Sequence, residues 1–284
     1  MEEPMDRHST FHIGGPAECF ITVDTIKQLG AVLSYLQKTE WDFFILGNGS
    51  NLLVGDRGYR GVIIQLGTDF NGIEVNGSEV TAGAGALLGS IAKEALEAGL
   101  TGFEFAAGIP GTLGGAVRMN AGAYGGDMNQ VVESVDVMGY DGEILTLDNA
   151  TMEFGYRTSA IKDRPYVVLS AKLRLSPGNK EEIAETMRNL AKQRRDKQPL
   201  EFPSAGSTFK RPEGYFAGKL IMDAGLAGKT CGGAQISEKH CGFVINQGNA
   251  TAADVAQLIS ETQETVQDKF GVTLEPEVIF LGDF

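Results

Sequence analysis

Residues 43–53, FFILGNGSNLL, place an apolar strand directly before a glycine-rich loop. The strand covers Phe43–Leu46, and the loop begins at Gly47. The two glycines of the loop expose backbone N–H groups, and Ser50 and Asn51 add side-chain donors. Such a nest of donors suits a diphosphate, although an ordinary glycine turn between two strands has the same composition. A P-loop is excluded because no Gly-Lys-Ser/Thr follows.

A second glycine-rich segment covers residues 106–116, AAGIPGTLGGA, and is followed at residues 120–126 by NAGAYGG. So many glycines allow the backbone to approach a large flat cofactor closely. The spacing is not the dinucleotide fingerprint Gly-x-Gly-x-x-Gly, because no strand leads into it in the right register and no acidic residue follows at the ribose distance. A Rossmann domain is therefore not expected.

The pattern around these loops is mixed α/β. Apolar runs predict strands at residues 19–23, 43–46, 61–66, 79–82, 134–140, 144–147, 167–175 and 242–246. Helical spacing predicts helices at residues 26–37, 87–98, 180–197, 216–224 and 252–270. Asp141-Gly142 predicts a hairpin turn, residues 198–204 a hinge, and residues 272–284 an extended tail.

The composition, 42% hydrophobic and 21% charged, is that of a folded globular protein. A net charge of -13 repels nucleic acid and anionic membranes, so neither is expected as a partner. No signal core and no apolar run of the roughly 20 residues of a membrane helix is present, so a cytoplasmic location is expected. We also expect a monomer.

The three cysteines and three histidines are scattered along the chain. Cys19, Cys231 and Cys241 lack Cys-x-x-Cys spacing, which favours reduced thiols over a disulfide framework. No zinc pattern is formed by His8, His12 and His240. No metal site is therefore expected.

Three polar residues lie in positions suited to chemistry. Arg157, after the turn-like Phe154-Gly155, could grip a carboxylate in a bidentate manner or form a surface ion pair. Ser207 has small neighbours and by its motif alone is a loop serine, since no Gly-x-Ser-x-Gly elbow of a hydrolase nucleophile is present. Glu277 lies in an otherwise apolar stretch, where burial would favour its neutral form, whereas Glu275 is expected to be solvated.

Together these motifs resemble the UDP-N-acetylenolpyruvoylglucosamine reductases, and the spacing from Tyr156-Arg157 to Gly206-Ser207 is similar to that of their compact second type. The resemblance implies an α+β fold, namely a two-subdomain FAD-binding fold of the vanillyl-alcohol-oxidase type with a small C-terminal α/β substrate-binding domain. The implied boundaries are 1–66 for the first FAD subdomain, to which the tail 273–284 returns, 67–196 for the second, and 197–272 for the substrate domain.

The resemblance also implies the site residues. The catalytic residues are Arg157 and Glu277, which stabilise an aci-enolate, and Ser207, which donates a proton. The implied FAD-binding residues are Gly47, Asn48, Gly49, Ser50, Asn51, Leu52, Gly111, Thr112, Gly114, Gly115, Ala116, Asn120, Gly122 and Ala123. The implied substrate-binding residues are Tyr156, Lys197, Lys219 and His240, although the lysines could belong to a solvated face and His240 to the core.

The implied reaction is the NADPH-dependent reduction of UDP-N-acetylglucosamine enolpyruvate to UDP-N-acetylmuramate through non-covalently bound FAD. This UDP-sugar is a precursor in peptidoglycan synthesis. One alternative on the same fold is an FAD-dependent oxidase of an alcohol or hydroxy acid, in which His12 could be taken for the cofactor tether. The other is a flavin- or nucleotide-storing binding module, in which Arg157, Ser207 and Glu277 would have no function.

Overall fold

The computed structural model describes residues 2–284. Contacts between residues divide the chain into two compact units. The central unit comprises Ile21–Gly47 and Ile63–Arg194, and the C-terminal unit comprises Asn48–Val62, Arg195–Phe284 and the residues up to Phe20. The three-part division with boundaries near residues 66 and 196 remains a prediction.

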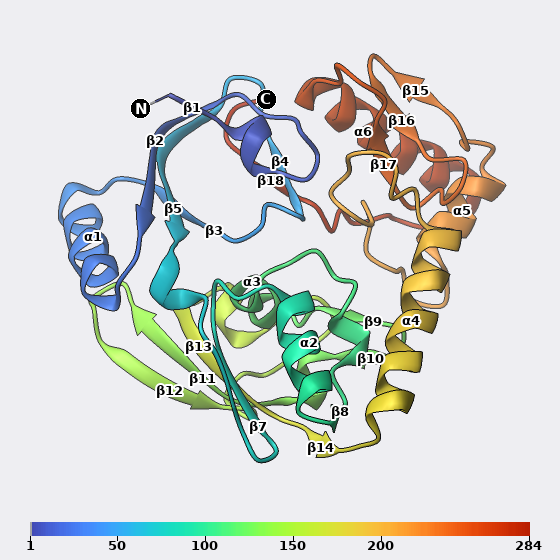
Figure 1. The fold of residues 1–284 in the computed structure, drawn as a ribbon. Helices are drawn as coiled ribbons and strands as arrows, with labels where there is room; N and C mark the ends of the chain where they lie inside the picture. Colours follow the sequence, from blue (N-terminus) through green and yellow to red (C-terminus); the bar gives the residue numbers. More distant parts are fainter. Residues whose placement is uncertain (1) are drawn as a thin grey trace. The chain divides into compact units, whose positions relative to one another are not determined.

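The central unit is built on a five-stranded antiparallel sheet in the order β12-β11-β13-β7-β6 (Figure 1). Helices α2 and α3 pack on this sheet, and the core between them contains the fully buried Ile91, Leu113 and Leu173. The bounds are β6 Ile73–Asn76, β7 Glu79–Gly83, α2 Leu88–Glu97, α3 Leu113–Arg118, β11 Val132–Gly139, β12 Ile144–Asp148 and β13 Tyr166–Arg174.

The turn between β11 and β12 confirms the predicted hairpin. The N–H of Gly139 donates to the carbonyl of Glu143 at 2.8 Å, and Gly142 has a φ of +89°. A left-handed φ is accessible to glycine at little cost, which is why the Asp-Gly pair marks this turn in the sequence.

Two long helices of the chain follow their sequence signals closely. Helix α1, Ile26–Thr39, begins with a capping box in which the side chains of Thr25 and Gln28 each accept a backbone N–H. Gly30 on this helix faces Met138 of β11, where an added Cβ would lie 3.7 Å from the sulfur. Helix α4, Lys180–Lys197, is highly charged and buries only Ile183.

The C-terminal unit contains a small antiparallel sheet in the order β15-β16-β17, against which α6 packs. Thr251 and Asp254 form a capping box at the start of α6, and Gly271 ends the helix with a φ of +67°. The bounds are α5 Ala217–Asp223, β15 Thr230–Cys231, β16 Ala234–Ile236, β17 Val244–Asn246, α6 Ala252–Phe270 and β18 Ile279–Leu281. Strand β18 pairs in parallel with β4, Leu52–Val54.

The chain passes between the two units within β2, Pro16–Val23, after Gly47, within β5, Tyr59–Leu66, and near the end of α4. These strands belong to a sheet in the order β1-β2-β5-β3. The remaining short elements are β1 Glu3–Pro4, η1 Met5–His8, β3 Phe43–Leu46, η2 Thr68–Phe70, β8 Leu100–Thr101, η3 Glu104–Ala106, β9 Gly122–Ala123, β10 Gly126–Asp127, η4 Met128–Gln130, η5 Ala160–Lys162 and β14 Ser176–Pro177.

The five predicted helices are confirmed as α1, α2, α4, α5 and α6. The strand predicted at residues 242–246 is shorter, because β17 begins at Val244, and the tail that was expected to be merely extended forms β18. Helix α3 and strands β4, β6, β15 and β16 were not predicted. Within residues 2–284 no helix is long and apolar enough to cross a membrane, and no cluster of His, Cys, Asp and Glu could hold a metal ion.

Candidate active site

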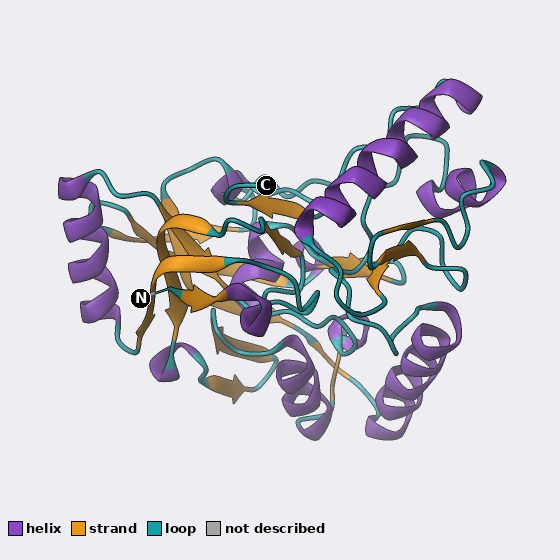
Figure 2. Ribbon diagram, turned by 90° about the horizontal axis from the view of Figure 1, so that it is seen from above, coloured by secondary structure: helices purple, strands orange, loops and turns teal. Residues whose placement is uncertain are grey.

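The first glycine-rich loop lies between β3 and β4 in the sequence. It is one of the loops that connect the helices and strands, all of which Figure 2 draws in teal. Its first residue, Gly47, belongs to the central unit. A Cβ added to Gly47 would lie 2.6 Å from Oγ1 of Thr112, so a larger residue would displace the threonine. The contact brings together the two segments that were predicted to bind the cofactor.

The surroundings of Gly49, in the C-terminal unit, leave no room for a larger residue. It has a φ of +61°, and an added Cβ would lie only 2.0 Å from the carbonyl oxygen of His8. The N–H of Thr10 donates to the Gly49 carbonyl at 3.2 Å. The glycine therefore allows the loop to lie directly against residues 8–10.

Two adjacent glycines at the start of α3 differ in their surroundings. A Cβ on Gly114 would lie 3.0 Å from Cβ of Ala84, so packing within the unit disfavours a larger residue there. Gly115 is exposed, and the nearest atom to an added Cβ is Oγ1 of Thr112 at 3.8 Å. Internal packing thus does not require glycine at residue 115, whereas the close approach of a ligand to the backbone would. Ala116 is buried and belongs to the core.

Arg157 lies in a tight turn of the central unit and has a φ of +56°, an uncommon conformation for a residue with a Cβ. The turn is closed by reciprocal backbone hydrogen bonds between Gly155 and Thr158. The guanidinium of Arg157 donates to the carbonyl of Gly122 at 3.2 Å and lies 5.1 Å from the ring centre of Tyr156. The structure therefore places Arg157 beside one predicted cofactor-binding residue and one predicted substrate-binding residue.

Ser207 and Glu277 both lie in the C-terminal unit, where Thr208 connects them. The N–H of Glu277 donates to the carbonyl of Thr208 at 2.8 Å, and the N–H of Thr208 donates to the carbonyl of Gly242 at 2.8 Å. Thr208 also accepts the N–H of Val244 through Oγ1 at 3.0 Å. The half-buried Ser207 hydroxyl has no hydrogen-bond partner among residues 2–284, so its proton is available to a ligand.

Asn51 joins the first glycine-rich loop to Glu277 within the same unit. Its Nδ2 donates to the carbonyl of Glu277 at 3.0 Å, and its own carbonyl accepts the N–H of Ile279 at 3.0 Å. Glu275, two residues earlier, is exposed as predicted and pairs with Nζ of Lys210 at 2.9 Å. The loop residue Asn51 thus fixes the backbone on which the carboxyl group of Glu277 is carried.

The other predicted substrate-binding residues of the C-terminal unit have different surroundings. Lys197 is exposed at the end of α4. Lys219 forms an ion pair with Asp223 at 2.8 Å, four residues along α5. His240 lies against Gly218 of α5, accepts the N–H of Gly242 through Nδ1 at 3.1 Å, and has its pKa lowered by burial. A histidine held in its neutral form can offer a hydrogen bond to a ligand without a charge.

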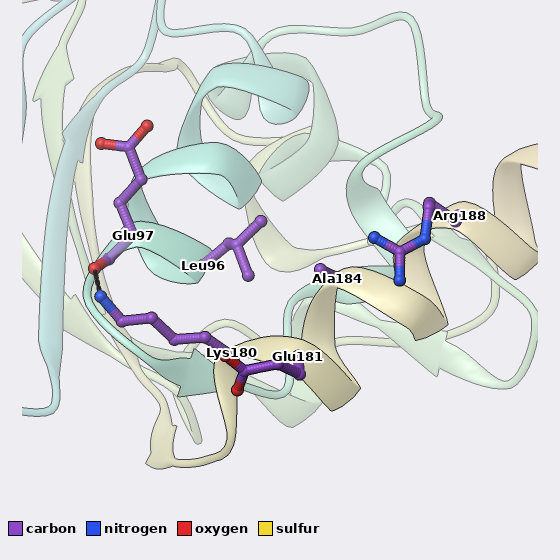
Figure 3. A pocket seen from close by; sticks show the side chains of 6 residues that line it. All are labelled: Leu96, Glu97, Lys180, Glu181, Ala184 and Arg188. Atoms are coloured by element: carbon purple, nitrogen blue, oxygen red, sulfur yellow. Dashed lines mark hydrogen bonds between the residues drawn. The ribbon is translucent and has the colours of Figure 1, made fainter.

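The central unit also has a surface cavity of about 580 Å³ between the end of α2 and the start of α4 (Figure 3). Lys180 at its edge donates to the carbonyl of Glu97. Two cationic and two anionic side chains share the lining, which gives no preference for a ligand of either charge; the lining residues are Leu96, Glu97, Lys180, Glu181, Ala184 and Arg188. None of the predicted site residues is among them.

Sequence reasoning missed Thr208 and Thr10. Oγ1 of Thr10 donates to the carbonyl of Ser204 at 2.7 Å, which fixes the start of the segment that carries Ser207. Both threonines act through partners that are far away in the sequence, and no local motif could have revealed them.

Comparison with known proteins supports the same assignment. Residues 17–148 match the FAD binding domain family, and residues 198–281 match the UDP-N-acetylenolpyruvoylglucosamine reductase C-terminal domain. A reductase of that name from Agathobacter rectalis is 51% identical over 295 residues, which cover 100% of this chain and 94% of the relative. One from Clostridioides difficile is 53% identical over 283 residues, which cover 100% and 93% of the two chains.

The chain belongs to the UDP-N-acetylenolpyruvoylglucosamine reductase family. The crystal structure of a reductase from Thermus caldophilus is similar to it with a TM-score of 0.85 and 38% identity, over 98% of this chain and 97% of that one. The predicted fold class is thereby confirmed as an FAD-binding fold with the C-terminal domain of this family. The reductase is an oxidoreductase with FAD as its cofactor, as predicted.

The space around Gly115 and the contact of Gly47 with Thr112 both fit a bound FAD. At Gly115 the backbone is exposed and an added Cβ would meet nothing closer than 3.8 Å, so an approaching cofactor has room there. Gly47 lies against the hydroxyl of Thr112, which places a side-chain donor beside the first loop. Bare backbone and hydroxyl groups are donors that suit a diphosphate and a flat ring system.

Proposed function

We propose that this reductase catalyses the NADPH-dependent reduction of UDP-N-acetylglucosamine enolpyruvate to UDP-N-acetylmuramate, a precursor of peptidoglycan. Membership of the reductase family supports the substrate class. The observation on which the chemical assignment depends is the backbone pairing of Thr208 with Glu277, which holds Ser207 and Glu277 in one compact unit.

Bound FAD would supply hydride equivalents from NADPH to the terminal vinyl carbon of the substrate. Ser207 then provides the proton for the carbon that bears the ether oxygen, so the C=C bond gains one hydride and one proton. A hydroxyl without a partner among the described residues 2–284 can be aligned by the substrate itself. Proton transfer from a positioned side chain contributes typically ~10²–10⁴-fold to a rate.

Arg157 and Glu277 are proposed to bind the substrate carboxylate as negative charge develops on it. A guanidinium can donate two parallel hydrogen bonds to a carboxylate, and its charge is permanent. The contact of Arg157 with the carbonyl of Gly122 and the ring of Tyr156 fixes the direction of the side chain before the substrate arrives. Donors oriented in advance stabilise a developing oxyanion more effectively than donors that must reorganise.

The remaining substrate contacts are proposed to come from Tyr156, Lys197, Lys219 and His240. Of these, Lys219 would have to exchange its ion pair with Asp223 for a substrate phosphate. The exchange is feasible because an exposed ion pair contributes little to stability.

An anaerobic absorbance experiment on the FAD-loaded enzyme tests the proposal. NADPH should bleach the flavin, and UDP-N-acetylglucosamine enolpyruvate should restore the oxidised spectrum. Ser207→Ala should be bleached normally but reoxidised by the enolpyruvyl sugar about 10²–10⁴-fold more slowly. Ser260→Ala, at an exposed position in the same unit, serves as the matched control. Recovery that requires oxygen would instead favour an oxidase, and equal damage to both half-reactions would refute the role of Ser207.

A further inference from the structure

Asn120 occupies a strained and buried position in the central unit, at the start of the glycine-rich stretch 120–126. It follows α3, has only 4% of its surface exposed, and has a φ of +45°. Asparagine tolerates the left-handed region better than most residues with a side chain, but the conformation still has a cost. A residue kept in this conformation inside a protein is held there by its contacts.

Both polar atoms of the Asn120 side chain are used inside the unit. Nδ2 donates to the carbonyl of Gly155 at 2.9 Å, and Oδ1 accepts the N–H of Asn129 at 2.9 Å. The carboxylate of Asp127 lies at 3.5 Å from the same Nδ2. The amide therefore connects three chain segments to one another, and its polar groups face protein atoms.

The carbonyl that Asn120 binds belongs to the turn that carries Arg157. Gly155 and Thr158 exchange the two backbone hydrogen bonds that close this turn. The guanidinium of Arg157 in turn donates to the carbonyl of Gly122, two residues after Asn120. The segment 120–122 thus holds the turn at its backbone and Arg157 at its charged end.

A second buried side chain also supports the turn. Oγ of Ser159, which is 4% exposed, donates to the carbonyl of Arg118 at 2.7 Å. Gly155 and Ser159 flank Arg157, and both are bound by the three-residue segment 118–120. A turn with an arginine at a φ of +56° is stable only while such contacts define it.

We propose that Asn120 is a positioning residue for Arg157: its amide fixes the 155–158 turn and thereby orients the guanidinium for the substrate carboxylate. The inference extends the proposed function, because it assigns Asn120 to the step in which Arg157 acts. It differs from the sequence-based expectation that Asn120 binds the cofactor. Substitution at residue 120 therefore slows the reaction with the enolpyruvyl sugar and spares flavin binding.

Two variants of the FAD-loaded full-length chain test the proposal. Asn120→Ala removes the amide, and Asn120→Gly removes it while favouring the left-handed backbone, so the second variant keeps the test available if the first does not fold. We expect unchanged flavin content, bleaching by NADPH within about threefold of wild type, and reoxidation by the enolpyruvyl sugar slowed by roughly 10–100-fold, the range that lost positioning produces.

A double-mutant cycle with Arg157→Ala identifies the route of the effect. If Asn120 acts through Arg157, Asn120→Gly adds less than about threefold to the loss already caused by Arg157→Ala. Multiplied losses would overturn the proposal. Loss of FAD from Asn120→Gly, with FAD retained by Arg157→Ala, would show instead that Asn120 is a cofactor ligand.

Amide hydrogen exchange of residues 155–159 gives a readout that does not depend on any substrate. Asn120→Gly should speed exchange in this segment by about tenfold or more, because opening of the turn becomes easier. Unchanged exchange would overturn the proposal even if the wild-type enzyme did not reduce the enolpyruvyl sugar. The two proposals can also fail separately. If Asn120→Gly speeds exchange but the wild-type enzyme does not use that sugar, the proposed function is refuted and the positioning of Arg157 remains supported.

Discussion

The two compact units hold their proposed catalytic residues in different ways. In the C-terminal unit, a backbone hydrogen bond between Thr208 and Glu277 joins the segments that carry Ser207 and Glu277, and the side chain of Asn51 adds a bond to the carbonyl of Glu277. In the central unit, the backbone hydrogen bonds of the Arg157 turn are local to the turn, and the side chains of Asn120 and Ser159 connect it to the rest of the unit. Backbone pairing survives most substitutions of side chains, whereas a side-chain clamp is lost with one mutation.

This difference indicates in which unit a substitution away from the ligand should slow the reaction. In the C-terminal unit, residues that do not touch a ligand should affect stability more than rate. In the central unit, buried residues around the turn should affect rate as well, because Arg157 depends on a conformation that its own backbone disfavours.

The largest expected effect is on Ser207 itself. Ser207→Ala should slow reoxidation by the enolpyruvyl sugar by about 10²–10⁴-fold, the contribution of a positioned proton donor, and leave the free energy of unfolding nearly unchanged. Stopped-flow absorbance and denaturant unfolding measure the two quantities. A large loss of stability would contradict the backbone-based support of this segment.

Ser159→Ala tests the side-chain clamp of the central unit. The variant removes the hydrogen bond from Oγ to the carbonyl of Arg118. We expect reoxidation to slow by about tenfold, equivalent to ~1.4 kcal/mol of lost transition-state stabilisation. Rates of both half-reactions should be compared, since a uniform decrease would indicate general damage to the unit and not a displaced Arg157.

Thr208→Val is the matched change in the C-terminal unit. Thr208 is as deeply buried as Ser159, and its Oγ1 accepts the N–H of Val244. Substitution by valine removes this acceptor and preserves the shape of the side chain. The N–H of Val244 then lacks its acceptor, which should lower the free energy of unfolding by about 1–3 kcal/mol. Reoxidation should slow by less than about threefold, because the backbone hydrogen bond between Thr208 and Glu277 remains. If Thr208→Val and Ser159→Ala slow the reaction equally, the distinction between the two units is wrong.

The smallest expected effect is the pH dependence contributed by His240. Burial lowers its pKa in the folded chain, so the unfolded chain takes up the proton first as the pH falls. The stability contributed by the neutral ring is present above the ordinary histidine pKa of about 6.5 and is lost as the pH falls towards the lower folded value. Denaturant unfolding at pH 7.5 and about 5.5 should therefore show a larger loss for wild type than for His240→Gln, in the range where histidine titrates. An identical loss in both would exclude this contribution.

Local sequence signals predicted helices α1, α2, α4, α5 and α6 because each signal is complete within a few residues, whereas the short, glycine-containing α3 was missed. The capping pairs Thr25 with Gln28 and Thr251 with Asp254 mark where α1 and α6 begin. Strand β6, Ile73–Asn76, was missed because it contains two polar residues and lacks the continuous apolar run that marked β3, and its pairing with β7 decides its structure.

The sequence by itself determined which residues could do the chemistry. A permanent cation in Arg157, a hydroxyl in Ser207, a carboxyl group in Glu277 and glycines that expose backbone donors are properties of residue types, and their motifs are local. The tertiary structure alone decided what holds them. Thr208 pairs with Gly242 and Glu277, and Asn120 binds the turn of Arg157. Such hydrogen bonds form between segments far apart in the chain, and only folding brings donor and acceptor within 3 Å.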